Sequence, residues 1–136
     1  MTDFNKTELD DLLAMPMEIT RSAWFEAAHY LHVCKQGQGY QQLHGHSFKV
    51  DISLRGVPEG ENGWVEDLAA IGGALETIRN QLDHACLNEI PGLETPSLEH
   101  LCAWIAARLA PKFSNLATIR VSRPSLSESC LLRLQQ

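Results

Sequence analysis

The fold is decided by one strictly alternating stretch, His46-Ser47-Phe48-Lys49-Val50-Asp51-Ile52-Ser53-Leu54-Arg55. Its even-numbered positions are histidine or hydrophobic, and its odd-numbered positions are polar or charged. Because successive side chains of a β-strand point to opposite faces, the stretch predicts a half-buried strand. The strand is expected to end at Gly56, where the sequence Gly56-Val57-Pro58-Glu59-Gly60 is typical of a turn.

The segments around this strand alternate between β-like and helical patterns. Upstream, residues 17–29 favour an irregular strand and residues 30–43 a long loop. Downstream, hydrophobic residues recur every three or four positions, which predicts two amphipathic helices. The stripes are Val65, Leu68, Ile71, Leu75, Ile78 and Leu82, then Leu98, Leu101, Cys102, Ile105 and Leu109. With β-like residues 117–123 and 129–134, the order ββααββ predicts an α+β domain: a four-stranded antiparallel sheet with two helices on one face.

The chain divides into an N-terminal extension and one domain. Residues 1–16 are the extension, with a short helix ended by a proline, and residues 17–136 hold the single domain, because 136 residues leave too little sequence for a second core. Thr95 is a possible cap for the second predicted helix, with Pro96 in its first turn. The pair Gly72-Gly73 inside the first helix costs roughly 2 kcal/mol relative to alanines.

The composition excludes several classes of protein. The formal charge is −6 and the 11 Lys and Arg residues are scattered, which argues against nucleic-acid binding. Hydrophobic runs fall short of the roughly 20 residues that span a bilayer, and the start lacks the pattern of a secretory signal. We therefore expect a cytoplasmic protein without nucleic-acid or membrane partners. The 4 cysteines include no CxxC pair, so neither a zinc ribbon nor a disulfide framework is indicated.

The sharpest local signal is His44-Gly45-His46. Residues two apart on a strand point to the same side, so both imidazoles face one point. Imidazole is a common zinc ligand, and three histidines plus water form an open catalytic site. His29 is the natural third ligand if the first two strands form a hairpin. The alternative is a polar strand end with unrelated histidines, because so short a motif often occurs by accident.

Further motifs accompany the histidines in a fixed order. They are Phe25-Glu26-Ala27-Ala28-His29, Leu43-His44-Gly45-His46-Ser47, Gly63-Trp64-Val65-Glu66-Asp67-Leu68, Leu82-Asp83-His84-Ala85-Cys86-Leu87-Asn88 and Pro96-Ser97-Leu98-Glu99. Together they resemble the family of 6-pyruvoyltetrahydropterin synthase and its bacterial relative, 6-carboxytetrahydropterin synthase. The resemblance implies the tunnelling fold, in which subunits join their sheets into a barrel. It also implies a homo-oligomer, commonly a hexamer of two trimers, with active sites at subunit interfaces.

The same resemblance implies roles for individual residues. The zinc (Zn²⁺) ligands of the family correspond to His29, His44 and His46. Asp83 would orient His84 for proton transfer, and Ser97, at a helix start, would contact the pterin substrate. The implied reaction converts dihydroneopterin triphosphate to 6-carboxytetrahydropterin, an early step towards queuosine and other 7-deazapurines. Zinc can acidify C–H groups beside the substrate oxygens that it polarises, and a nearby histidine can then move protons.

Two positions depart from the family pattern. Tyr40 stands where the family usually has a catalytic cysteine, and a phenol of pKa near 10 is a weaker source of base than a thiol near 8.5. Cys34 would replace that thiol only if the loop folded back. Arg123 stands where a glutamate usually anchors the pterin, and it can only donate hydrogen bonds. Glu128 could substitute, the alternative being a solvated loop carboxylate.

Three functional hypotheses follow. The leading one is a zinc-dependent lyase of the 6-carboxytetrahydropterin synthase type, with Tyr40 at the altered catalytic position. A related pterin side-chain lyase, such as a 6-pyruvoyltetrahydropterin synthase-like enzyme, is the close rival. From a different class comes a catalytically impaired paralogue that keeps the zinc and the barrel.

Overall fold

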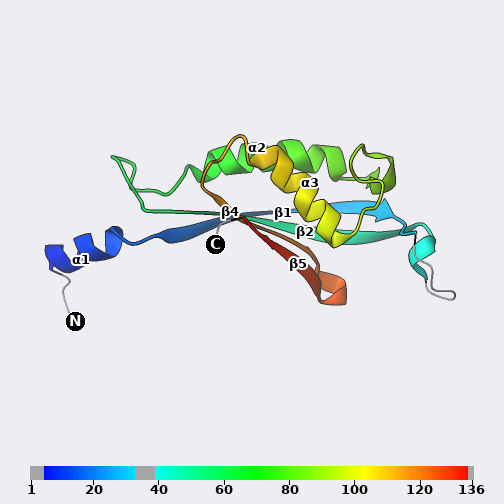
Figure 1. The fold of residues 1–136 in the computed structure, drawn as a ribbon, viewed down its shortest axis with the longest axis horizontal. Helices are drawn as coiled ribbons and strands as arrows, with labels where there is room; N and C mark the ends of the chain where they lie inside the picture. The colour runs from blue at the N-terminus through cyan, green and yellow to red at the C-terminus, as the bar shows by residue number, and fades with distance from the viewer. Residues whose placement is uncertain (1–4, 33–38, 135–136) are drawn as a thin grey trace.

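The computed structural model describes residues 5–32 and 39–134. A five-stranded sheet in the order β3-β1-β2-β4-β5 forms its body, with helices α2 and α3 on one face (Figure 1). The strands are β1 (Met17–His29), β2 (His44–Gly56), β3 (Ala85–Cys86), β4 (Leu116–Arg123) and β5 (Glu128–Arg133). The helices are α1 (Lys6–Leu13), α2 (Leu68–Leu82) and α3 (Leu98–Leu109), with short 3₁₀ turns η1 (Gly39–Gln41), η2 (Leu87–Glu89) and η3 (Pro124–Leu126).

Strands β1 and β2 form a long antiparallel hairpin that determines which side chains share a face. Their pairing is continuous from Met17 opposite Gly56 to His29 opposite His44. Directly opposed residues of an antiparallel pair point to the same face. The predicted strand at 46–55 is confirmed. The pattern of β1 looked irregular in sequence because most residues in the first half of this strand are exposed.

The core lies between the sheet and the two helices. Phe25 and Phe48, opposed in the hairpin, are buried with ring centroids 4.9 Å apart. Helix α3 buries its whole predicted stripe, and α2 buries four of its six predicted residues: Ile71, Leu75, Ile78 and Leu82. Of the other two, Val65 precedes α2 and Leu68 is 43% exposed. Helix α2 begins at Leu68 because the Asp67 carboxylate accepts the Ala69 N–H at 2.9 Å.

Two details of the predicted fold are wrong. The sheet is five-stranded and mixed, because β3 pairs in parallel with Ala27 and Ala28 of β1. A strand of two residues has no periodicity that a sequence pattern could reveal. The cap of α3 is Ser97 rather than Thr95: its hydroxyl accepts the His100 N–H at 3.1 Å, and Pro96 precedes the helix.

The short helix expected in the extension is confirmed as α1, which projects beyond the sheet in Figure 1. Asn5 caps it, with its side chain accepting the Glu8 N–H at 2.8 Å. None of its residues is buried. Within the described ranges, no helix is long and hydrophobic enough to cross a membrane.

The adjacent glycines of α2 provide a matched stability test. A Cβ at Gly73 would meet nothing within 4 Å, so Gly73→Ala is expected to raise the free energy of unfolding by about 1 kcal/mol. A Cβ at Gly72 would lie 2.8 Å from Cζ of Arg21, which must move aside. Gly72→Ala should therefore raise the free energy of unfolding by less than Gly73→Ala does. Urea denaturation of both variants measures the difference, and an equal gain would contradict this packing.

Candidate metal centre and its surroundings

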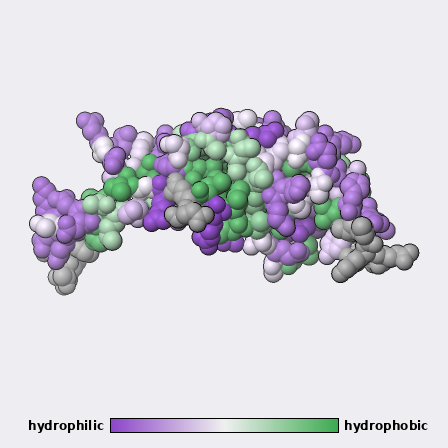
Figure 2. Space-filling model, in the orientation of Figure 1, coloured by the Kyte–Doolittle hydropathy of each residue, from purple (hydrophilic) through white to green (hydrophobic). Residues whose placement is uncertain are grey.

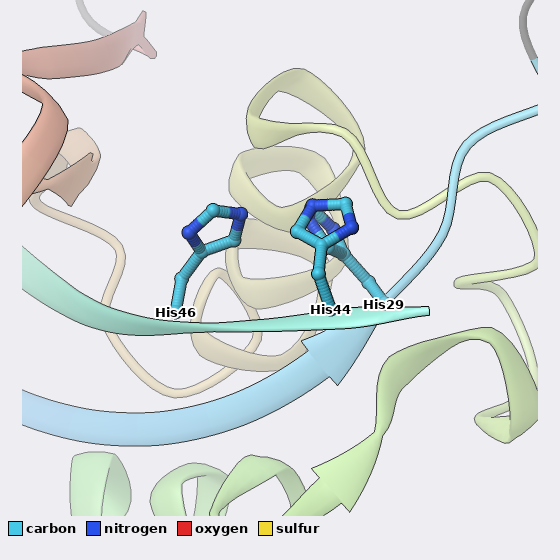
Figure 3. A group of neighbouring side chains, drawn as sticks. All are labelled: His29, His44 and His46. Carbon is cyan, nitrogen blue, oxygen red and sulfur yellow. The ribbon is translucent and has the colours of Figure 1, made fainter. Parts of the chain in front are cut away.

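The hairpin brings His29, His44 and His46 together at one end of the sheet. His44 lies opposite His29 and His46 opposite Ala27, so all three side chains leave the same face. Figure 3 shows the three rings on the same side of the strands. Their centroids are 4.6 to 5.0 Å apart, and one ligand nitrogen from each lies within 4.8 Å of the others. The cluster could hold a metal ion.

Backbone carbonyls orient two of these rings. Nδ1 of His29 lies 2.9 Å from the Pro96 carbonyl, and Nδ1 of His44 lies 2.7 Å from the Gln42 carbonyl. A carbonyl can only accept, so each Nδ1 carries the proton and each Nε2 keeps a free lone pair. Nε2 of His29 and of His46 are buried with no hydrogen-bond partner among the described residues. Such unpaired buried nitrogens fit a metal centre, because ligation would satisfy them.

Burial also favours the neutral form of His29 and His46. It lowers the pKa of His29, and burial together with the nearby His29 and His44 lowers the pKa of His46 to about 4. Arg123 contributes to the lowering at both residues. A neutral imidazole is the form that binds a metal, so His29 and His46 are competent ligands at neutral pH.

The metal-free protein is expected to lose stability as the pH falls from 6.5 to 4. The pKa of His46 is about 4 in the folded chain and 6.5 as the reference value. Between these pH values the unfolded chain binds more protons at His46 than the folded chain does, so the free energy of unfolding decreases as the pH decreases. Above pH 6.5 His46 is neutral in both states and adds no pH dependence to the stability. Thermal melts of chelator-treated protein test this. His46→Gln should flatten the slope, and an unchanged slope would contradict the assignment.

Three further residues lie around the histidines. In the ladder Val50 opposes Val121, so Arg123, two residues later, is on the face of the histidines. Glu128 opposes Arg123, and its Oε2 accepts from Arg123 Nη2 at 3.2 Å. Ser97 follows Pro96, whose carbonyl holds His29. Ser97 therefore adjoins a residue that orients His29, and its hydroxyl caps α3. Glu128 acts electrostatically on His46, and it also lines a cavity with Lys49 and Asp51 of the opposite face.

Asp83 and His84 form a hydrogen-bonded pair at the edge of β1. Asp83 accepts the Glu26 N–H at 2.9 Å, Arg79 Nη2 at 3.2 Å and His84 Nδ1 at 3.0 Å. The bond from Glu26 is the main cause that lowers the pKa of Asp83, which is therefore ionised at neutral pH. His84 has a φ of 60°, and its N–H donates to the Glu26 carbonyl at 2.6 Å. Asp83 thus fixes the tautomer of an imidazole whose side chain is 80% exposed.

This pair is not part of the histidine cluster. Ala85 pairs with Ala27 and Cys86 with Ala28, which places Cys86 on the face opposite the histidines, and His84 directly precedes this strand. His84 lines a cavity of about 570 Å³ together with Glu26, Ser47 and Cys86, and His46 of the cluster also borders this cavity. His84 is not one of the three described residues whose ligand atoms lie within 4.8 Å of one another.

Tyr40 lies in η1, just before the histidine motif. Its side chain is 45% exposed, and it lines a surface pocket with His44. Its carbonyl accepts the Leu31 N–H at 2.6 Å, which ties the loop to the end of β1. Cys34 lies outside the described residues.

Sequence reasoning missed the groups that support the site. The carbonyls of Pro96 and Gln42 carry no side-chain signal, so no motif could have revealed their bonds to the imidazoles. Arg123 was read only as a lost glutamate. To predict that Arg123 pairs with Glu128, one would need to know the exact turn of the β4–β5 hairpin, in which Ser127 adopts a left-handed φ of 54°.

Comparisons with known proteins agree with this architecture. The family model described as 6-pyruvoyl tetrahydropterin synthase matches residues 18–133. A 6-carboxy-5,6,7,8-tetrahydropterin synthase of Synechocystis is 38% identical over 62% of this chain and 68% of its own length. A dihydroneopterin monophosphate aldolase of Pyrococcus furiosus is 28% identical over 84% of this chain and 91% of its own.

A solved structure shows the same fold. The 6-pyruvoyl tetrahydropterin synthase of Caenorhabditis elegans superposes with a TM-score of 0.78 at 20% identity, covering 89% of this chain and 97% of that one. With the family model matched over nearly the whole described chain, the assignment rests on sequence and fold together. The chain belongs to the 6-pyruvoyl tetrahydropterin synthase family.

Proposed function

We propose that the chain is a zinc-dependent pterin lyase of the 6-carboxytetrahydropterin synthase type. It would convert dihydroneopterin triphosphate and water to 6-carboxytetrahydropterin, with release of acetaldehyde and triphosphate, on the route to queuosine and other 7-deazapurines. The observation that carries the proposal is the cluster of three imidazoles, two with buried Nε2 atoms that lack partners. The name of the Synechocystis relative supports the reaction. The proposal places the enzyme in the cytoplasm, where phosphorylated metabolites are kept.

Different residues would bind the metal, transfer protons and bind the substrate. His29, His44 and His46 would hold zinc, which supplies a Lewis acid that makes C–H groups beside the bound oxygens more acidic. His84 would move protons at Nε2, because Asp83 holds the other ring nitrogen in its protonated form. Ser97 and Glu128 would bind the pterin. Tyr40, in place of the usual thiol, remains a candidate proton carrier.

We further propose that a second copy of the chain completes the site. The Asp83–His84 pair is not part of the histidine cluster, and one subunit would supply the metal and its neighbour the proton carrier. Two open sheet edges favour assembly: β5 ends the sheet on one side, and on the other β3 covers only Ala27 and Ala28 of β1. Figure 2 shows hydrophobic surface near the end of α3 and the start of β4. A trimer-based ring, such as a hexamer, fits these features.

A second candidate reaction is aldol-type cleavage of a pterin side chain. It is favoured by the name of the Pyrococcus furiosus relative, a dihydroneopterin monophosphate aldolase, and by Tyr40 in place of a thiol. This reaction would release a two-carbon aldehyde phosphate and leave a 6-hydroxymethyl pterin. The third hypothesis, a zinc-binding paralogue without activity, predicts neither product.

One experiment separates the three hypotheses. The zinc-loaded chain is incubated in turn with dihydroneopterin triphosphate and dihydroneopterin monophosphate, and products are identified by mass spectrometry. We expect 6-carboxytetrahydropterin and acetaldehyde from the triphosphate. A 6-hydroxymethyl pterin from the monophosphate would favour the aldolase. A protein with bound zinc and no product from either compound would leave only the inactive paralogue.

A further inference from the structure

The side chain of Asn88 bonds both backbone groups of a single residue, Tyr30. Its Oδ1 accepts the Tyr30 N–H at 3.0 Å, and its Nδ2 donates to the Tyr30 carbonyl at 2.9 Å. A primary amide offers the same acceptor and donor as a peptide group. Asn88 therefore pairs with Tyr30 as the backbone of a neighbouring strand would.

This amide continues the ladder between β1 and β3. Strand β3 pairs in parallel with Ala27 and Ala28 of β1, at an offset of 58 positions along the chain. Tyr30 and Asn88 have the same offset, although Asn88 lies in η2, after the end of β3. The side chain of Asn88 thus adds a rung to the ladder at a position that the two-residue strand does not reach.

His29 lies between the last pair of β3 and this added rung. Its ring is buried, and its Nδ1 is 2.9 Å from the Pro96 carbonyl. On the other side of β1, the pairing with β2 ends where His29 opposes His44. The Asn88 amide therefore holds the backbone directly after the last residue that the hairpin holds. A rotation of that backbone would turn the His29 ring away from the other two imidazoles.

We propose that Asn88 is a positioning residue for the metal ligand His29. The inference rests on the proposed function, because it takes the histidine cluster as the zinc site. Loss of a group that orients a metal ligand typically costs about 10- to 100-fold in metal affinity. A residue that only stabilises the fold would instead lower the melting temperature and leave the zinc affinity of the folded chain unchanged.

The zinc affinity of the full chain tests the inference. Competition with a chromophoric chelator measures the Kd at a temperature where circular dichroism shows each variant to be folded. Asn88→Ala is expected to raise the Kd for zinc by about 10- to 100-fold. Asn88→Asp should also raise it, because the carboxylate accepts the Tyr30 N–H but cannot donate to the Tyr30 carbonyl. If Asn88→Ala does not fold, Asn88→Asp decides.

Asn115→Ala is the matched control. The Nδ2 of Asn115 donates to the Val65 carbonyl at 3.5 Å, so this side chain also bonds the backbone of a distant segment. It lies near Gly56, at the end of the hairpin that is far from His44. This variant should keep the parental affinity for zinc, whatever its melting temperature.

The ring of His29 gives a second readout that needs no metal. Long-range ¹H–¹⁵N NMR spectra of the metal-free chain at about pH 8, where imidazoles are neutral, show which ring nitrogen carries the proton. The parent should carry it on Nδ1, since the Pro96 carbonyl can only accept. In Asn88→Ala we expect a mixture of the two tautomers, whereas Asn115→Ala should match the parent.

The outcomes separate this inference from the lyase proposal. Parental zinc affinity and a parental His29 tautomer in both Asn88 variants would overturn the inference, even if their melting temperatures fell. A raised Kd together with mixed tautomers would support it, even if neither dihydroneopterin phosphate were cleaved. If the parent bound no zinc, the lyase proposal would fail, and the tautomer of His29 alone would decide the role of Asn88.

Discussion

His46→Ala is expected to abolish stoichiometric zinc binding and, with it, activity. The change leaves two imidazoles, too few for the three-ligand site that a catalytic zinc requires. Because even loss of a group that merely supports a ligand costs about 10- to 100-fold in metal affinity or activity, loss of the ligand itself should cost at least about 100-fold. Metal analysis of the purified variant and a lyase assay measure both effects.

His100→Ala is the matched control for this variant. His100 is exposed on α3, and its side chain is not part of the histidine cluster. This control should retain one zinc per chain and parental activity. Full zinc content in His46→Ala would show that the cluster is not the metal site. A zinc loss of equal size in His100→Ala would point to a general effect of histidine removal.

His84→Ala is expected to lower kcat by roughly 10²- to 10⁴-fold, the usual loss on removal of a general acid–base group. Zinc content should not change, since His84 is not part of the cluster. Asp83→Asn should lower kcat as well, because an amide no longer fixes the protonated Nδ1 of His84. Steady-state kinetics together with metal analysis distinguish a proton carrier from a metal ligand.

Co-expression of His84→Ala and His46→Ala chains tests whether subunits share the site. In a mixed oligomer, about a quarter of the interfaces would combine an intact cluster from one chain with an intact Asp83–His84 pair from another. Activity should therefore reappear well above that of either variant alone. A double variant that carries both changes in one chain, co-expressed with the parental chain, controls for expression. No recovery in the mixture would mean that the pair does not act across an interface.

The placement of the histidines could be predicted because it depends only on strand geometry. Alternation puts His44 and His46 on one face, and a hairpin turns His29 towards them once its register is known. The helices α2 and α3 could also be predicted, because a helix that buries one face has hydrophobic residues every three or four positions. These features are encoded by residues close together in the chain.

The position of Asp83–His84 could not be predicted in this way. It depends on β3, a strand of two residues, and on the left-handed backbone of His84. A strand of two residues shows no alternation, and a positive φ is uncommon at any residue other than glycine, so neither feature could be predicted from the sequence. Likewise, Thr95 and Ser97 are both good capping residues, so the sequence alone does not distinguish them, and in the structure Ser97 caps α3.

X-ray absorption spectroscopy of the zinc-loaded full chain tests the central claim most directly. We predict three imidazole nitrogens at about 2.0–2.1 Å and one further light atom from water, without sulfur. A sulfur contribution near 2.3 Å would assign the metal to the cysteines and contradict the account, as would a first shell with fewer than three imidazoles.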